Sequence, residues 1–159
     1  MSNLLLDAAE EDCQRYFVEI IPHNGALGMR FVSRAPGRVV FDLPYREDLV
    51  GDPSSGVIHG GVITTLIDAA CGQAVLTKLP ELRRVATLDL RIDYLRPAQP
   101  GKTVRCVAEC YRLTRKVAFT RATAHDGDEN DLLATSAGTF MVFADATSSH
   151  AAAGLVKPS

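Results

Sequence analysis

The chain has 159 residues, of which 47% are hydrophobic and 23% charged, and its formal net charge is -2. A chain of this length forms one domain with a full hydrophobic core, and its charge excludes an overall basic footprint for nucleic acid. No apolar run is long enough to cross a bilayer, and the acidic segment 1–11 lacks the basic start of a signal peptide. We therefore expect a cytoplasmic protein that binds neither nucleic acid nor membrane.

Four cysteines bear on the redox state of the protein and on metal binding. Cys13, Cys71, Cys106 and Cys110 lack the C-x-x-C spacing of metal ligands. Cys106 and Cys110 would share one face of a strand, where small buried hydrophobic residues are common. We expect four reduced thiols and no metal site.

The N-terminal part predicts a helix and then a β-hairpin. Apolar residues at helical spacing indicate an amphipathic helix over 4–16, within an N-terminal lead-in of residues 1–24. Two β-rich runs, 28–34 and 38–43, flank the turn signal Pro36-Gly37. A loop rich in Asp, Pro, Ser and Gly follows.

The rest of the chain predicts one long helix and then a meander of strands. The apolar segment 60–77 has a helical period and ends before Pro80. A sheet that curls around this helix would bury it on most sides, so we expect an α+β fold in which residues 25–145 form an antiparallel sheet around one central helix. Residues 146–159 are expected to be a disordered tail. The four predicted strands are 85–95, 103–113, 117–125 and 132–143.

The helix predicted from residue 60 to residue 77 carries an acid at its middle. Apolar residues occur nearly all round it, which is typical of a buried helix, yet Asp68 interrupts them. A buried carboxylate costs several kcal/mol unless it is paired or solvated. The alternatives are an acid that faces a ligand space and a structural Asp bonded to the backbone or to an arginine from a strand. At about 100° per residue, Asp68 shares an arc with small or hydroxylated residues and one valine: Gly61, Thr64, Thr65, Gly72 and Val75.

The residues His59-Gly60-Gly61 precede the helix. The first N–H groups of a helix lack intrahelical partners, and the macrodipole adds partial positive charge there. Glycines let a ligand approach this backbone closely, which suits the oxyanion formed when a carbonyl is attacked. His59 could be a general base, but its position favours anchoring the helix start by a side-chain hydrogen bond.

Together these motifs resemble a known family. His59-Gly60-Gly61 followed by Leu66-Ile67-Asp68-Ala69-Ala70-x-Gly72 resembles the signature of hotdog-fold thioesterases of the phenylacetate-pathway (PaaI-like) type. The run Asp89-x-x-Ile92-x-Tyr94-Leu95-Arg96-Pro97-Ala98 resembles the strand after the helix in that family, and the likeness extends over residues 25–143. The resemblance implies a hotdog fold and the hydrolysis of acyl-CoA or aryl-CoA thioesters without a metal. It implies no cofactor, since CoA is part of the substrate.

The resemblance also implies residue roles. Asp68 would be the nucleophile or the general base, the Gly60 N–H would bind the oxyanion, and Thr87 would assist the acid. CoA contacts would come from the strand 94–97 and the turn 112–116.

One position departs from the family pattern. Some relatives have an Asn six residues before the His, where this chain has Pro53. Because proline has no side-chain donor, that role is vacant or falls to Ser54 or Ser55, and the substrate stays open.

Positive charge is concentrated between Arg83 and Arg121. This segment holds ten Lys or Arg and three acids, a net charge of +7. It suits a ligand that carries phosphates, while solvation of strand surfaces is the alternative. The candidate substrate-binding residues are Gly61, Thr64, Tyr94, Arg96, Pro97, Arg112, Arg115 and Lys116.

Thioester hydrolysis needs few catalytic groups. The leaving group is the thiolate of a thiol with a pKa near 8.5, which departs without a general acid. An oxyanion hole and a carboxylate that attacks or activates water are sufficient. Cys71 lacks an evident activating base and is a poor nucleophile candidate. Two other functions stay open: a hydratase or dehydratase that pairs Asp52 with His59, and an acyl-CoA binding module that needs no Asp68.

The positions of Gly60 and Asp68 bear on the assembly. They are eight residues apart on one helix, about 12 Å along its axis, whereas both must lie within about 3 Å of one carbonyl. Two antiparallel helices from two subunits satisfy both contacts. We therefore expect a homodimer with two shared sites, with a dimer of dimers as the larger alternative.

Overall fold

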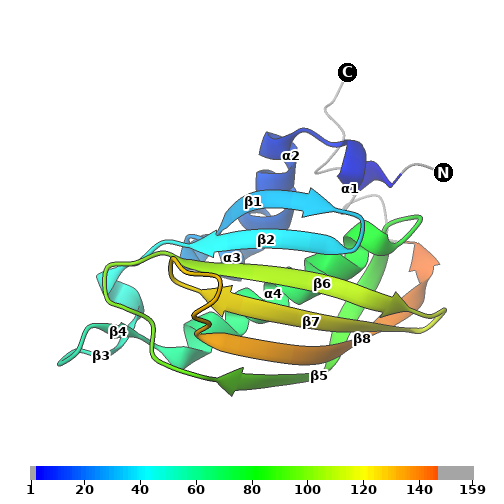
Figure 1. Ribbon diagram of the computed structural model, residues 1–159. Helices are drawn as coiled ribbons and strands as arrows, with labels where there is room; N and C mark the ends of the chain where they lie inside the picture. Colours follow the sequence, from blue (N-terminus) through cyan, green and yellow to red (C-terminus); the bar gives the residue numbers. More distant parts are fainter. Residues whose placement is uncertain (1–2, 147–159) are drawn as a thin grey trace.

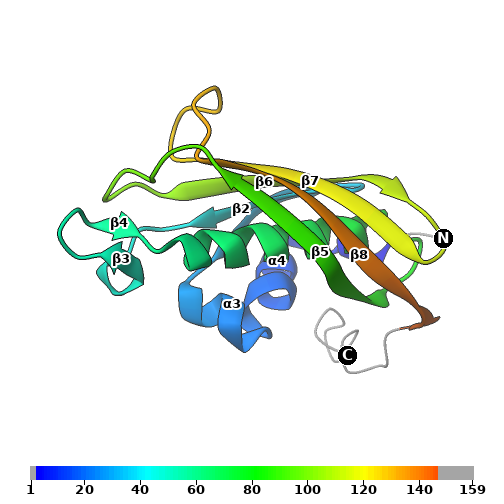
Figure 2. The same cartoon turned by 90° about the horizontal axis from the view of Figure 1, so that it is seen from below.

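A computed structural model describes residues 3–146 of the chain. Six strands form one antiparallel sheet, in the order β1-β2-β6-β7-β8-β5, and one long helix lies across its concave face (Figures 1 and 2). The expected α+β architecture, a curled antiparallel sheet around a central helix, is confirmed. The tail expected to be disordered lies outside the described residues, apart from Ala146. The strands are β1 (Arg30–Ala35), β2 (Arg38–Leu43), β5 (Arg83–Tyr94), β6 (Val104–Leu113), β7 (Val117–His125) and β8 (Ala134–Ala146).

The central helix α4 (Gly60–Lys78) agrees closely with the predicted segment. It ends where Leu79 takes an extended conformation before Pro80. By length and composition α4 could cross a membrane, but the core helix of a soluble domain passes the same test, and more than half of α4 is buried in this protein. Its fully buried residues face the sheet: Leu66, Ile67, Ala70, Cys71, Ala74 and Val75.

The packing of α4 on the sheet is uneven. It packs most against β6 and β2, to a similar extent against β7 and β5, and less against β8. Figure 2 shows the helix beneath the sheet, with β5 running past its side. The sparse packing against β8 leaves space for a cavity between α4, β8 and β5.

The N-terminal segment differs from the prediction of one helix over 4–16, which is wrong. Ala8 and Ala9 are extended and separate two short helices, so that Leu5 and Cys13 each reach the core. A further helix, which the sequence analysis missed, begins at Pro22. The segment consists of α1 (Leu4–Asp7), α2 (Glu10–Gln14), the π-helical η1 (Arg15–Glu19) and α3 (Pro22–Leu27).

The segment expected to be a loop between the hairpin and α4 holds a small ribbon. A 3-10 turn η2 (Glu47–Leu49) precedes β3 (Val50–Asp52) and β4 (Val57–Ile58), which pair with each other. The Asp52 carboxylate accepts hydrogen bonds from the hydroxyls of Ser54 and Ser55 at 2.7 and 2.6 Å and closes the turn.

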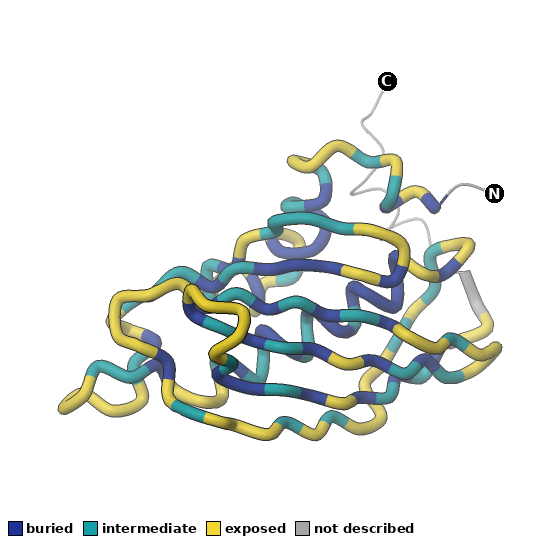
Figure 3. Tube along the Cα trace, in the orientation of Figure 1, coloured by how far each residue is buried: buried dark blue, intermediate teal, exposed yellow. Residues whose placement is uncertain are grey.

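The two edge strands, β1 and β5, differ in whether their outer backbone groups have hydrogen-bond partners. At β1, the Phe31 N–H donates to Gln14 Oε1 (2.6 Å), and Gln14 Nε2 donates to the Met29 carbonyl (3.4 Å). At β5, nothing within residues 3–146 pairs with the outer edge, and Leu88 and Tyr94 are 54% and 48% exposed (Figure 3). An exposed edge of this length is a template for pairing with another strand.

An ion pair holds the segment after β5 to the β7–β8 turn. The Arg96 guanidinium donates to both carboxylate oxygens of Asp126, at 2.7 and 3.2 Å, and to the Asp131 carbonyl. The Gln99 N–H also donates to Asp126, whose side chain is 2% exposed. These hydrogen bonds, led by those from Arg96, lower the pKa of the Asp126 carboxyl to about 2.

This ion pair predicts a pH-dependent contribution to stability. A carboxyl with a lowered folded-state pKa stabilises the fold above its unfolded pKa, and this contribution is lost as the pH falls from about 4 to about 2. At pH 7, Asp126→Asn should lower the free energy of unfolding by about 2 kcal/mol in urea titrations. The deficit should shrink toward pH 2. A deficit that is constant with pH would show that the charge of Asp126 is not its cause.

Candidate functional site

Asp68 lies on the side of α4 that faces β5 and is half-buried. Thr87 Oγ1, on β5, donates a hydrogen bond to Asp68 Oδ1 at 2.7 Å. The β5–β8 register shifts between Thr87 and Asp89, and such irregularities commonly re-aim a side chain beside a site. In the part of the chain that the structure describes, no arginine or backbone group bonds to Asp68, so the interpretation as a structural Asp is not favoured.

The Asp68 carboxylate borders a cavity of about 320 Å³ between α4, α3, β5 and β8. Gly72 helps to keep it open, since a Cβ there would lie 3.5 Å from Phe140 Cε1. The proline at the start of α3 could have located that helix in the sequence, but nothing in the spacing placed it beside Asp68. The lining residues that the sequence analysis missed include Ile21, His23, Asn24, Gln73, Leu76, Val85 and Phe140.

A second cavity, of about 360 Å³, borders the N-terminus of α4. Tyr94 Oη donates to the Gly60 carbonyl (2.7 Å) and lies 2.6 Å from Thr64 Oγ1. Pro97 and part of Arg96 also line this cavity, which brings these predicted binding residues together. The guanidinium of Arg96 is already engaged with Asp126, which the sequence did not indicate.

His59 is the N-cap of α4. Its Nδ1 accepts the Gly61 N–H at 2.9 Å, the anchoring contact that its position favoured. Because Nδ1 is an acceptor, a neutral His59 carries its proton on Nε2. Gly61 is packed so closely that a Cβ would lie 2.9 Å from this nitrogen. With the Gly61 N–H engaged, the N–H of Gly60 is the donor left for an oxyanion at this helix start.

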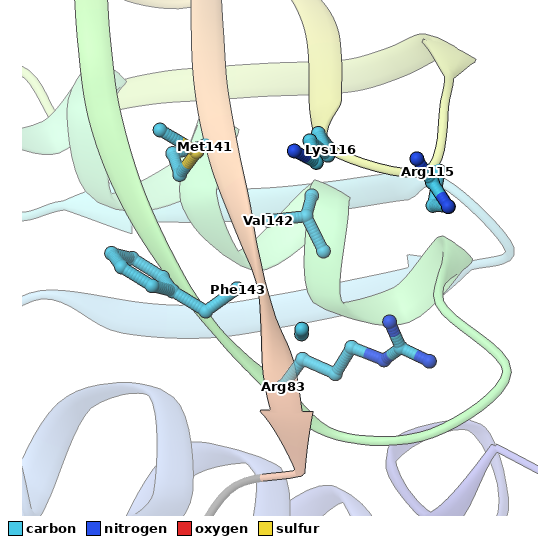
Figure 4. A pocket seen from close by; sticks show the side chains of 7 residues that line it. Arg83, Arg115, Lys116, Met141, Val142 and Phe143 are labelled. Carbon is cyan, nitrogen blue, oxygen red and sulfur yellow. The ribbon is translucent and has the colours of Figure 1, made fainter.

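A third cavity, of about 600 Å³, lies where β8 passes the β6–β7 turn (Figure 4). Arg115 and Lys116 line it, together with Arg83, which the sequence analysis did not select. Its floor is apolar and includes Met141 and Val142. Arg112 is exposed and lies outside this lining. Of the three cations predicted at this turn, Arg115 and Lys116 therefore border the cavity and Arg112 does not.

The cysteines offer no activated thiol. Cys71 is fully buried, and this burial raises the pKa of its thiol to about 11. All four cysteines of the described chain are free and buried. A neutral buried thiol is a poor nucleophile, which agrees with the expectation for Cys71. Within residues 3–146, no three His, Cys, Asp or Glu side chains cluster as a metal site would require.

Comparisons with known proteins bear on this site. The family model described as "Thioesterase superfamily" matches residues 55–133, which contain both His59-Gly60-Gly61 and Asp68. The medium/long-chain acyl-CoA thioesterase YigI of Escherichia coli K12 is 31% identical over 139 residues, covering 79% of this chain and 88% of that protein.

Two solved structures add to this likeness. A Pseudomonas aeruginosa crystal structure is 41% identical, with a TM-score of 0.73, over 82% of this chain and 96% of that one. A mutant of the phenylacetic acid degradation protein PaaI from Thermus thermophilus is 32% identical, with a TM-score of 0.67, over 77% of this chain and 99% of that one. This chain therefore belongs to the thioesterase superfamily, as a thioester hydrolase of the PaaI-like hotdog type.

Proposed function

We propose that the substrates are acyl-CoA or aryl-CoA thioesters, with Asp68 as nucleophile or general base and the Gly60 N–H as oxyanion donor. The observation that carries this proposal is the Asp68 carboxylate, held by the Thr87 hydroxyl at 2.7 Å on the wall of an open cavity. The printed activity of YigI, an acyl-CoA thioesterase, agrees with it.

The reaction follows from these groups. Asp68, or a water that it deprotonates, attacks the thioester carbonyl carbon, and the negative charge that forms on oxygen is stabilised by the Gly60 N–H. The C–S bond then breaks, and CoA leaves as a thiolate. Where water attacked, the free acid has formed; where Asp68 attacked, water hydrolyses the acyl–Asp68 anhydride, which frees the acid and regenerates the carboxylate. Thr87 positions the carboxylate by donating to Oδ1, so that the other oxygen is left for the reaction.

The roles of Asp68 and Thr87 predict graded losses of activity. Asp68→Asn should lower kcat/KM by about 10³-fold or more, since general-base catalysis alone contributes about 10²–10⁴-fold. Thr87→Val removes one positioning hydrogen bond and should cost about 10-fold, mostly in kcat. A thiol-release assay over short, medium, long and aromatic acyl-CoAs measures both.

Asp128→Asn, at an exposed turn, is the matched control for the loss of a carboxylate. Retained hydrolysis in Asp68→Asn, with unfolding temperatures equal to that of the original protein, would contradict the assignment. Silence of the original protein across the whole panel would contradict the substrate class.

We further propose a homodimer whose sites combine the Asp68 cavity of one chain with the Gly60 cavity of the other. The two cavities of one chain share no lining residue, and their key groups are about 12 Å apart along α4. The open edge at β5, in contrast to the β1 edge that Gln14 caps, supports pairing through β5. A dimer of dimers would repeat this unit.

The shared site predicts complementation between two inactive chains. An Asp68→Asn chain and a Gly60→Pro chain, which lacks the N–H, should regain activity when mixed, because each heterodimer contains one intact site in two. Size-exclusion chromatography and exchange of labelled subunits establish the mixing, and circular dichroism establishes that the proline variant is folded. No recovery despite proven exchange would place the site within one chain.

We propose that Arg115 and Lys116, with Arg83, contact the phosphates of CoA. Among the described residues, no salt bridge engages Arg115 or Lys116, whereas Arg96 is committed to Asp126 and Arg83 also pairs with Glu81 at 2.6 Å. The three cations border one cavity (Figure 4), which supports binding of a polyanion.

This contact predicts a dependence of KM on charge and salt. Replacing both Arg115 and Lys116 by Glu should raise KM about 10-fold or more with a small change in kcat, and KM of the original protein should rise with added salt. Replacing both Arg30 and Arg38 by Glu, at exposed positions of β1 and β2, makes the same change in net charge and is the control. Equal KM in the variant and the original protein would leave these cations with a solvating role.

The other two functions receive less support. A hydratase would pair Asp52 with His59, but Asp52 is bonded to Ser54 and Ser55 and His59 to the Gly61 N–H. A binding module would not need the hydrogen bond between Thr87 and Asp68. We also propose a cytoplasmic location, which the four free thiols of the described chain support.

A further inference from the structure

A side chain on the wall of the Asp68 cavity carries a buried carbonyl oxygen without a partner among the described residues. Gln73, on α4, is 8% exposed and lines the cavity together with Asp68. Its Oε1 is buried and has no hydrogen-bond partner among the described residues. A buried carbonyl oxygen without a partner is costly, and nearly all such groups in proteins are satisfied.

Other buried side-chain amides of the protein are satisfied. Asn3 Nδ2 donates to the carbonyls of Leu76 and Leu79, and Asn24, across the cavity on α3, donates to the Phe17 carbonyl at 3.0 Å. Gln14, which is half-buried, both donates and accepts at the edge of β1. Gln73 differs from these because its side chain lines the space next to the candidate catalytic acid, where a rotation of the terminal amide about χ3 presents Oε1 to a ligand.

We propose that the acyl group lies along α4 from Asp68 toward Leu76, and that the Gln73 amide binds a hydroxyl on the distal part of that group. This proposal rests on the proposed function. The path from Asp68 to Leu76 is about 12 Å long. An extended chain advances about 1.25 Å per carbon, given C–C bonds of about 1.5 Å, so the path holds about eight to ten carbons. Apolar walls for the chain come from Leu76, Val85 and Phe140.

The chemistry of a hydroxyl matches that of the amide. A hydroxyl donates one hydrogen bond and accepts others. It can therefore donate to the carbonyl oxygen of the amide or accept from its NH₂ group, whichever of the two faces the ligand. A plain alkyl chain offers no donor and would leave Gln73 Oε1 unpaired. Sites that bind a substrate hydroxyl discriminate against analogues that lack it for this reason. The inferred substrate class is therefore a medium-chain hydroxyacyl-CoA.

The test compares matched substrates on two proteins. We would measure kcat/KM for octanoyl-CoA and for its 6-, 7- and 8-hydroxy derivatives, with the original protein and with Gln73→Met, which keeps the side-chain length without the amide. The original protein should prefer at least one hydroxy derivative about 10-fold, and Gln73→Met should reduce that ratio to 1 or below. A preference for octanoyl-CoA over all three derivatives, or a ratio that Gln73→Met leaves unchanged, would overturn the proposal.

Thermal unfolding tests the unpartnered amide without any substrate. Gln73→Met should raise the unfolding temperature by about 2–4 °C, because it removes a buried polar group that has no partner. The same change at Gln14 should lower it, since the Phe31 N–H loses its acceptor. A decrease in Gln73→Met as in Gln14→Met would show that Gln73 has a partner in the protein and would overturn the proposal.

Binding separates this proposal from the proposed function. Calorimetry with the Asp68→Asn chain compares the Kd of octanoyl-CoA with that of each hydroxy derivative in the absence of hydrolysis. Tighter binding of a hydroxy derivative, lost in the double variant with Gln73→Met, supports the role of Gln73 even if the original protein hydrolyses none of these esters. Hydrolysis of all four esters with equal Kd values would keep the proposed function and overturn the role of Gln73.

Discussion

The structure depends on one constraint, an apolar helix that must be buried while a carboxylate at its middle must not be. α4 meets it by packing most closely against β6 and β2, while the side with Asp68 lies toward β5. The carboxylate is then half-buried and receives a hydroxyl from Thr87, which avoids the cost of an unpaired buried charge. The cavity beside it lies where α4 packs sparsely against β8, so the site is a consequence of how the helix is covered.

On a straight helix, Gly60 and Asp68 lie too far apart to contact the same carbonyl group. The start of α4 offers the Gly60 N–H because His59 engages that of Gly61, and no bending of a helix brings this donor to Asp68. The fold supplies a route to a second chain through the asymmetry of its edges. Gln14 caps the backbone of β1, whereas β5 carries both Thr87 and the exposed edge. If two chains paired through β5, the same strand would form the subunit interface and contribute Thr87 to the candidate site.

Much of the fold could be predicted from the sequence, because strand alternation and helical period are local signals. The contact between Asp68 and Thr87 was expected only through the family resemblance, since the two residues lie on different elements. The break at Ala8 and Ala9 escaped prediction because alanine favours helix, and the burial of Leu5 and Cys13 decides otherwise. The sequence analysis treated Arg96 as a cation available to a ligand. In the structure its guanidinium donates to Asp126, which lies on a turn distant in sequence.

Two polar side chains of the cavity, Gln73 and Asn24, differ in whether a bond within the protein accounts for them. Replacing Gln73 by an apolar residue of similar size would remove an unsatisfied buried amide, so the packing of the fold alone gives no reason for glutamine at this position. Asn24, on the opposite wall, is accounted for by its bond to the Phe17 carbonyl, which ties α3 to η1. A residue whose Oε1 has no partner among the described residues, and which lines the space beside the candidate catalytic acid, is most simply explained by what enters that space. The N-terminal helices, which supply the opposite wall through Ile21 and Asn24, then belong to substrate selection as well as to the core.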